Sequence, residues 1–200
     1  MAKAHIDFWF DFASTYSYPA AMRVEALACA HDVAVRWRPF LLGPIFAAQD
    51  WRDSPFNIYP AKGRYMWRDL ARLCADYGLP FKHPTVFPHN SLLAARVALV
   101  GAEATWGPAL VRALYTANFA DDRDIADRGV IADLLTGLDL DAEAILTRAL
   151  SDANKAALKA QVAEAQRLGL FGAPTTMVGQ EMFWGDDRLD RAVAWAAARG

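Results

Sequence analysis

Cysteine is scarce in this sequence, and no two cysteines form a Cys-x-x-Cys pair. The chain carries only Cys29 and Cys74, and each stands among residues with a helical pattern. We therefore expect both to be buried thiols without a chemical role. Two cysteines and four scattered histidines do not supply a structural zinc site, so no metal is expected. The missing pair also disfavours a disulfide oxidoreductase, which needs two reactive sulfurs.

The sequence also lacks a large excess of one charge and a long apolar run. The formal net charge is −2 and no basic stripe is present, so no nucleic acid is expected as a partner. The longest apolar tract, "SLLAARVALVGAEA", contains Arg96 and Glu103 and is too short to cross a bilayer, so no membrane is expected either. Charge begins at Lys3, which argues against a signal peptide and predicts a cytoplasmic protein.

What the chain does contain is an apolar content that supports a well-packed domain. Hydrophobic residues make up 54% of its 200 residues, enough for one domain with an insertion. The pattern predicts a strand, a helix and a second strand at residues 5–11, 17–30 and 33–40. Pro19 falls in the first turn of that helix, where its missing N–H does no harm. This succession favours a right-handed parallel pair of strands.

The rest of the chain is mainly helical until a hairpin near the end. Residues 41–61 are rich in proline and aromatic residues and predict short helices or an ordered loop, and longer helical patterns follow. The segments "TTMV" and "EMFW" predict the hairpin, and residues 186–199 predict a last helix. The order predicts an α/β thioredoxin-like fold with a large all-helical insertion. The thioredoxin-like domain is expected in residues 1–43 and 169–200, and the insertion in residues 44–168.

The stretch "FDFASTYSYPA" passes from the first strand to the first helix and contains Ser14. Free N–H groups and the helix dipole at such a place favour negative charge, and they lower the pKa of a thiolate. Thioredoxin-like oxidoreductases carry their reactive cysteine in this region. Ser14 could instead donate its hydroxyl hydrogen to the thiolate of a bound thiol cofactor. The alternative is a simple helix cap by Ser14, Thr15 or Ser17.

The segment "FGAPTT" places a proline directly before a predicted strand, a usual position for a cis peptide bond. A cis bond between Ala173 and Pro174 would turn the Ala173 backbone outward. That backbone could then pair with an extended peptide ligand such as glutathione. The alternative is an ordinary loop proline.

The segment "WGDDRL" brings two carboxylates and a guanidinium to the start of a helix. Asp186 and Asp187 could cap that helix, or they could receive an α-ammonium group while Arg188 and the helix start hold a carboxylate. A γ-glutamyl group presents both of these charges, so this pairing would suit it.

Two further segments contribute polar residues. Lys62 and Tyr65 are three residues apart and share a helix face, where they could reach a ligand's carboxylate and a polar group. The alternative is a solvated lysine and a half-buried tyrosine. In "FPHNS", His89 and Asn90 could line a substrate pocket, or Asn90 could cap the following helix.

Four of these segments together resemble one family. "FDFASTYSY", "PAKGRYMWRDLAR", "FPHNSLLAARVAL" and "FGAPTTMVGQEMFWGDDRL" are similar to the 2-hydroxychromene-2-carboxylate isomerase family. That family is close to kappa-class glutathione transferases and to bacterial periplasmic disulfide oxidoreductases of the thioredoxin superfamily. The resemblance covers nearly the whole chain, in the same order.

The resemblance implies a homodimer of thioredoxin-fold subunits with glutathione bound at the edge of the sheet. By position, Ser14 matches the serine that contacts the glutathione sulfur, and Ala173 matches the residue whose backbone pairs with the cysteinyl unit. The γ-glutamyl site is matched by Asp186, Asp187 and Arg188.

The glycyl end of glutathione, or the substrate, is matched by Lys62 and Tyr65. The chain departs from many relatives at Thr15, where they have proline directly after the serine. Asn57 is a candidate for an asparagine that some relatives carry ahead of the lysine, and we group it with Asn90 as a substrate-binding candidate.

The function implied is a glutathione-dependent isomerase of aromatic hydrocarbon catabolism. Such an enzyme would interconvert a hydroxychromene carboxylate and a trans-hydroxybenzylidenepyruvate, with a small aromatic molecule as its partner. A kappa-class-like glutathione transferase or peroxidase is the first alternative. A non-catalytic thioredoxin-fold binding module is the second.

Overall fold

The structure, a computed structural model, describes residues 3–199. Its strands form one mixed sheet in the order β2-β1-β3-β4. The strands are β1 (His5–Phe10), β2 (Ala34–Pro39), β3 (Thr175–Val178) and β4 (Glu181–Trp184). β1 pairs in parallel with β2 and antiparallel with β3, and β3 pairs antiparallel with β4. The predicted parallel pair and the predicted hairpin are both confirmed.

The central strand β1 explains why an aromatic sequence folds as a strand here. Successive side chains of a strand point to opposite faces, so Phe8 and Phe10 enter one core while Trp9 enters another. The rings of Phe8 and Phe10 both meet Trp37 of β2 edge-on, with centroids 5.4 and 5.6 Å apart. Pro39 ends the edge strand β2, where its missing N–H removes no sheet hydrogen bond.

One long run of helices separates β2 from β3. These are α2 (Leu42–Ala47), α3 (Pro55–Ile58), α4 (Pro60–Asp76), α5 (Leu92–Val100), α6 (Gly107–Phe119), α7 (Arg128–Thr136), α8 (Ala142–Leu150) and α9 (Asp152–Arg167). Helix α1 (Ser17–Ala30) joins β1 to β2, and a short 3₁₀ helix η1 (Asp186–Arg188) followed by α10 (Leu189–Ala197) ends the described chain. The predicted order of elements is therefore confirmed.

Several helix ends follow directly from the sequence. The side chains of Asp127, Asp141 and Ser151 accept hydrogen bonds from the first turns of α7, α8 and α9. Gly78 and Gly169 adopt positive φ angles of 65° and 76° just beyond α4 and α9. Glycine has no Cβ to oppose that conformation, so each glycine favours the end of its helix.

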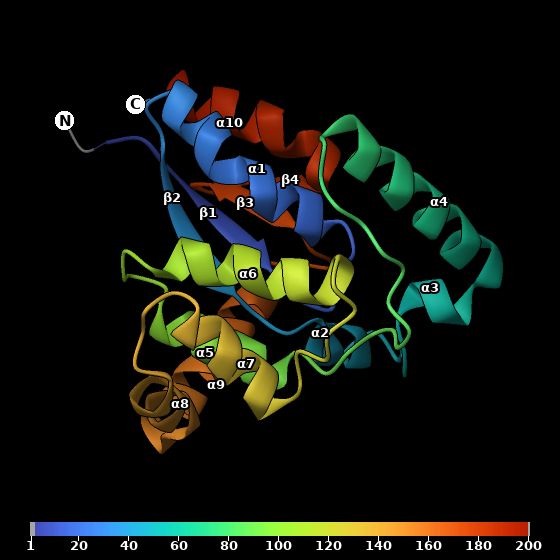
Figure 1. The fold of residues 1–200 in the computed structure, drawn as a ribbon. Coiled ribbons are helices and arrows are strands. Elements are labelled where there is room, and N and C mark those ends of the chain that lie inside the picture. Colours follow the sequence, from blue (N-terminus) through green and yellow to red (C-terminus); the bar gives the residue numbers. More distant parts are fainter. Residues whose placement is uncertain (1–2, 200) are drawn as a thin grey trace.

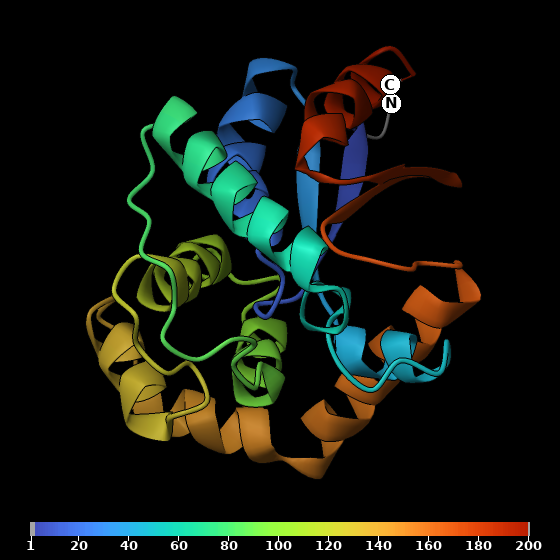
Figure 2. The same cartoon turned by 90° about the vertical axis from the view of Figure 1, so that its right-hand side faces the viewer.

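Helices α1 and α10 pack side by side against the sheet, while α5 and α7 to α9 gather at the opposite end of the molecule (Figure 1). Helix α4 stands in front of α1 and leaves a long connection to α5 (Figure 2). A single apolar cluster nevertheless runs from Phe8 of β1 through Leu114 of α6 to Leu146 of α8. The helices between β2 and β3 therefore share their core with the sheet. The proposed domain boundaries stay a prediction.

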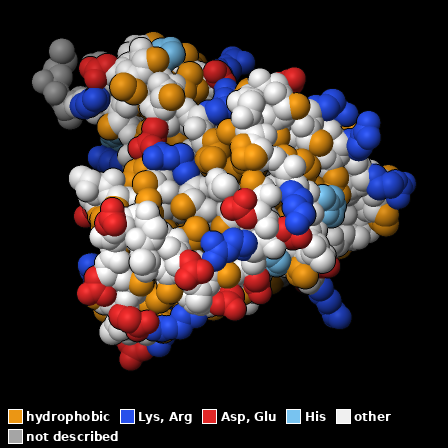
Figure 3. Space-filling view, viewed as in Figure 1, with side chains coloured by type: hydrophobic (Ala, Val, Ile, Leu, Met, Phe, Trp, Pro, Cys, Tyr) orange, Lys and Arg blue, Asp and Glu red, His pale blue; other side chains and the backbone are white. Residues whose placement is uncertain are grey.

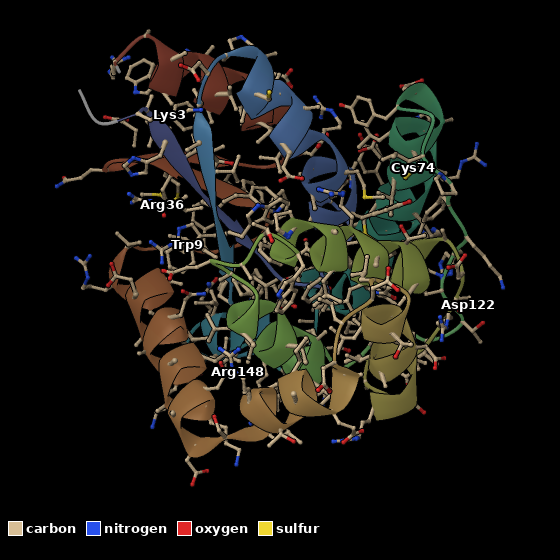
Figure 4. The ribbon with its side chains drawn as sticks, turned by 60° about the vertical axis from the view of Figure 1, so that its left-hand side comes forward. Lys3, Trp9, Arg36, Cys74, Asp122 and Arg148 are labelled. Atoms are coloured by element: carbon tan, nitrogen blue, oxygen red, sulfur yellow. The ribbon has the colours of Figure 1, made fainter. Side chains whose placement is uncertain are left out.

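The two cysteines lie in different environments. Cys74 is buried on the side of α4 that faces α1 (Figure 4). Cys29 is exposed near the end of α1, so the expectation that both thiols are buried is wrong for Cys29. It falls in the last turn of α1, next to the exposed Ala30 and His31, where the apolar face of the helix has already ended.

Charged side chains of both signs are mixed over the surface. Figure 3 shows acidic, basic and apolar side chains interspersed on one face of the molecule. Within residues 3–199 no helix has the length and apolar character needed to span a membrane.

Leu114→Ala should lower the free energy of unfolding by about 2–5 kcal/mol, because it leaves a cavity in the shared core. Urea unfolding followed by circular dichroism measures this change. The matched control is Leu150→Ala on α8, where the side chain is 39% exposed and the loss should be small. Equal losses for the two variants would contradict a core shared by the sheet and α6.

Candidate active site

A large cavity of about 1360 Å³ opens beside the ends of β1 and β3. Its walls come from the β1–α1 loop, from α2 to α4, from the connection before α5, and from the segments flanking the β3–β4 hairpin. Large aromatic side chains supply much of this wall: Phe46, Trp51, Phe56, Phe87, Phe171 and Trp184. Most candidate residues meet here, and those that line the cavity are Ser14, Lys62, Tyr65, His89, Asn90, Ala173, Asp186 and Asp187.

Two of the candidate residues do not line the cavity. The side chain of Asn57 donates to Asp53 at 3.1 and 3.2 Å. Arg188 is largely exposed and lies 3.5 Å from the carboxylate of Asp187. The cavity reaches their chain neighbours Phe56 and Asp187 but not these two side chains. The roles suggested for Asn57 and Arg188 therefore have no support in the geometry of the described residues.

Ser14 lies at the wall of the cavity and is 8% exposed. Its Oγ donates a hydrogen bond of 2.8 Å to the carbonyl oxygen of Ala173, across the chain from the β1–α1 loop to the segment before β3. The residue preceding α1 is Tyr16, and no side chain caps the helix there. Thr15 instead directs its hydroxyl toward the sulfur of Met66 at 2.8 Å. The capping interpretation of Ser14, Thr15 and Ser17 is therefore wrong.

The Ala173–Pro174 peptide bond is cis, as predicted. The two polar groups of the Ala173 backbone differ in what they contact. The carbonyl oxygen accepts the Ser14 hydroxyl, whereas the N–H makes no hydrogen bond within residues 3–199. An extended ligand can therefore pair with the N–H directly, and it must compete with Ser14 for the carbonyl.

The loop that carries Ser14 is fixed by buried hydrogen bonds. The carboxylate of Asp11 accepts the N–H groups of Ala13 at 2.9 Å and Leu42 at 2.7 Å, which ties the loop to the start of α2. From α6, the hydroxyl of Tyr115 donates to the carbonyl of Asp11 at 3.0 Å, and Asn118 donates to that of Phe12 at 2.9 Å. Burial raises the pKa of Asp11, and the hydrogen bonds it accepts oppose that rise.

Sequence analysis missed this support, although one signal was present. Asp11 directly follows a buried strand and precedes the Ser14 turn, a place where a carboxylate meets free backbone N–H groups. Tyr115 and Asn118 gave no such signal, because a helical pattern does not show which distant loop a polar side chain will reach.

Asp186 is only 3% exposed and forms the centre of a charged cluster. Its carboxylate accepts from Arg23 of α1 at 3.0 Å and from the hydroxyl of Tyr77 at 3.3 Å. The guanidinium of Arg23 also reaches Asp190 at 2.7 Å and lies 4.0 Å from the centre of the Tyr77 ring. Burial raises the pKa of Asp186, and the charge of Arg23 opposes that rise.

This cluster changes how the two neighbouring carboxylates are interpreted. Neither Asp186 nor Asp187 caps the following helix, because no side-chain cap is present at η1. Asp186 already has a cationic partner, while the side chain of Asp187 is 72% exposed. Asp187 is therefore the more accessible of the two for a ligand's ammonium group.

Lys62 and Tyr65 share a face of α4 and both line the cavity. The ammonium of Lys62 lies 4.8 Å from the centre of the Tyr59 ring and makes no ion pair within the described chain. Tyr65 is 62% exposed rather than half-buried. Asn90 also lines the cavity, and its Oδ1 accepts the N–H of Leu92 at 2.9 Å. The N-cap residue of α5 is Ser91, and no side chain caps that helix, so the capping alternative for Asn90 is wrong.

The sheet, the cis-proline segment and the cavity at the end of β1 define a thioredoxin-fold protein. The family model of the DSBA-like thioredoxin domain matches residues 5–194, and the chain belongs to that family. It is also 30% identical over 186 residues to 2-hydroxychromene-2-carboxylate isomerase of Sphingobium xenophagum, covering 92% of this chain and 94% of that protein. The chain thus belongs to the 2-hydroxychromene-2-carboxylate isomerase family, within the thioredoxin-like fold.

Two further comparisons agree with this placement. A solved structure of a 2-hydroxychromene-2-carboxylate isomerase superposes with a TM-score of 0.86 at 28% identity, covering 98% of this chain and 95% of that one. Glutathione S-transferase kappa 2 of Caenorhabditis elegans is 22% identical over 210 residues, covering 96% of this chain and 91% of that protein.

Arg23→Met should lower the free energy of unfolding by about 3–5 kcal/mol at neutral pH, because it leaves the buried Asp186 carboxylate without its cation. Protonation would neutralise this carboxyl, whose pKa is raised in the folded state. The loss should therefore grow as pH rises through that pKa and shrink as pH falls below it. Urea unfolding at several pH values measures the effect.

Two controls sharpen this experiment. Arg188→Met removes an exposed guanidinium and should change stability by less than about 0.5 kcal/mol. The double variant Arg23→Met/Asp186→Asn should regain much of the loss, since no buried charge remains. A loss that does not depend on pH would instead assign the effect to packing of Arg23 on Tyr77.

Proposed function

We propose that this protein is a glutathione-dependent isomerase of the 2-hydroxychromene-2-carboxylate type, acting in aromatic hydrocarbon catabolism. The observation that carries the proposal is the Ser14 hydroxyl on the cavity wall, 2.8 Å from the carbonyl of Ala173. This arrangement puts a hydrogen-bond donor for a sulfur beside a backbone that can pair with a peptide. The names of the similar isomerases and of the kappa-class relative support the same chemistry.

The residues of the cavity fit glutathione. The free N–H of Ala173 suits the peptide part, the exposed carboxylate of Asp187 suits the α-ammonium group, and Lys62 suits a carboxylate. The volume of about 1360 Å³ exceeds the roughly 300–1,000 Å³ typical of a site for one small ligand. A tripeptide and an aromatic substrate can therefore share it.

The chain's own groups favour an anionic sulfur beside Ser14. Helix α1 has no side-chain cap and no acidic residue in its first turn, so no carboxylate there opposes the effect of its dipole on a negative charge. The Ser14 hydroxyl has one hydrogen, which points to Ala173 in this structure. Rotation about the Cα–Cβ and Cβ–Oγ bonds would bring that hydrogen to a neighbouring sulfur, and it would release the Ala173 carbonyl to the peptide.

Glutathione, when bound here, would supply a thiolate able to add reversibly to an alkene conjugated with a carbonyl, chemistry that needs no oxidant or reductant. The aromatic wall of the cavity, including Trp51, Phe56 and Phe87, excludes water and receives the substrate ring.

Two alternatives remain as outcomes of measurement. A kappa-class-like transferase or peroxidase would consume glutathione, whereas an isomerase leaves total thiol unchanged over many turnovers. A non-catalytic binding module would turn over no substrate. The homodimer that the family resemblance implies stays a prediction, and so does the cytoplasmic location predicted from the early charge at Lys3.

Ser14→Ala should lower the isomerisation rate by roughly 10²–10³-fold, because it removes a hydrogen bond to developing charge on the sulfur. Steady-state kinetics with saturating glutathione, together with a thiol assay before and after turnover, measure the effect. Ser17→Ala is the matched control: it removes a buried hydroxyl from the start of α1 that does not line the cavity, and it should keep the wild-type rate. Wild-type turnover by Ser14→Ala would overturn the role given to Ser14.

Lys62→Met should weaken glutathione binding by roughly 1.5- to 5-fold, the range expected for one exposed charge pair. Calorimetric titration of glutathione measures the change, and its salt dependence should decrease in the variant. Lys159→Met on α9, outside the cavity, should bind like the wild type. An unchanged affinity for Lys62→Met would remove Lys62 from the glutathione site.

A further inference from the structure

One buried polar group of the cavity has no partner and no role in the function proposed above. His89 lines the cavity and is 8% exposed, and its Nδ1 is buried without a hydrogen bond within the described chain. Buried side-chain nitrogen and oxygen atoms are nearly always hydrogen-bonded in folded proteins, because an unpaired one costs desolvation energy. The ring therefore makes no hydrogen bond to the described chain, and only a ring nitrogen that reaches the cavity can find a partner, in a bound ligand.

The two nitrogens of the His89 ring differ in accessibility. Nδ1 is shut away from solvent, whereas Nε2 is neither fully buried nor hydrogen-bonded to a residue of the described chain. Because the side chain lines the cavity, Nε2 is the nitrogen that can meet a molecule inside it. A hydrogen on Nε2 would serve as a donor to that molecule and would leave Nδ1 as an unprotonated nitrogen.

His89 lies on the connection before α5 and lines the same cavity as Ser14 and Ala173. The charged groups suited to the ends of glutathione lie on other elements, Lys62 on α4 and Asp187 in η1. His89 is therefore separate from those groups and can meet the second molecule that the cavity accommodates.

The substrate class offers one oxygen that fits this donor. The oxygen on carbon 2 is a hydroxyl in the cyclic chromene form and the keto oxygen in the open form. Negative charge develops on this oxygen whenever the neighbouring alkene is attacked, so a fixed donor there stabilises the transition state more than the ground state. Beside His89, Phe87 and Pro88 line the cavity as an apolar wall suited to the rest of the molecule.

Resting on the proposed function, we propose that His89 is a catalytic residue that donates a hydrogen bond from Nε2 to the carbon-2 oxygen of the keto-acid substrate. The hydrogen stays on the imidazole, and no covalent bond forms or breaks at His89. The residue thus selects 2-keto acids over aromatic aldehydes or alkenes that lack this oxygen.

The test compares His89→Leu, which removes the donor, with His89→Gln, which keeps an amide donor of similar reach. His89→Leu should lower kcat/KM by roughly 10²-fold, while His89→Gln regains part of that loss. In the absence of glutathione, His89→Leu should also bind the trans keto-acid product roughly three- to tenfold more weakly by calorimetry. Its affinity for glutathione should stay at the wild-type value.

His31→Leu, at the exposed end of α1, is the matched control and should keep wild-type kinetics and binding. Circular dichroism confirms that each variant folds, and His89→Gln carries the test if His89→Leu does not. Wild-type keto-acid binding by a folded His89 variant overturns the inference, as does an equal loss of glutathione binding. If the wild type binds keto acid through His89 but does not isomerise it, the proposed function and the catalytic role of His89 fail, while the hydrogen bond from His89 to the keto acid stands.

Discussion

The hydrogen bond from Ser14 to the carbonyl of Ala173 is the contact around which the cavity is organised. It joins two segments separated by 159 residues, one at the end of β1 and one just before β3. Other interactions fix both segments. Hydrogen bonds of Asp11 and of Tyr115 of α6 fix the first, and pairing of β3 with β1 fixes the second. The two segments are therefore fixed independently of the hydrogen bond between Ser14 and Ala173. A ligand that replaces this hydrogen bond need not distort the sheet.

The helices between β2 and β3 do more than enlarge the molecule. Helix α6 packs in the same apolar cluster as β1 and supplies the donors that fix the Ser14 loop. Helix α4 supplies Lys62 to the cavity, and Tyr77, the residue directly after α4, joins the Asp186 cluster. These helices therefore contribute both to the cavity wall, through α4, and to the support of the Ser14 loop, through α6.

The secondary structure and the cis bond before β3 could be predicted from the sequence, because neighbouring residues determine them. The alternation in β1, the glycine stops and the proline before β3 each act within a few residues. Long-range contacts could not be predicted in the same way. The residues around Asp186 do not indicate that Arg23, on another helix, will pair with it. The residues around Asn57 likewise do not indicate that its side-chain amide will donate to Asp53. The cis bond at Phe87–Pro88 was also missed, since no strand follows it.

The two edge strands of the sheet affect the tendency of the protein to aggregate at high concentration. An open strand edge can recruit a strand from another molecule and start aggregation. Edge strand β2 ends in Pro39 and carries Arg36, exposed along the open side of the sheet (Figure 4). The opposite edge, β4, has only four residues and begins with the exposed Glu181. The proline, the charged side chains and the short length of these edge strands disfavour edge-to-edge pairing between molecules. The central strands can therefore be rich in aromatic residues.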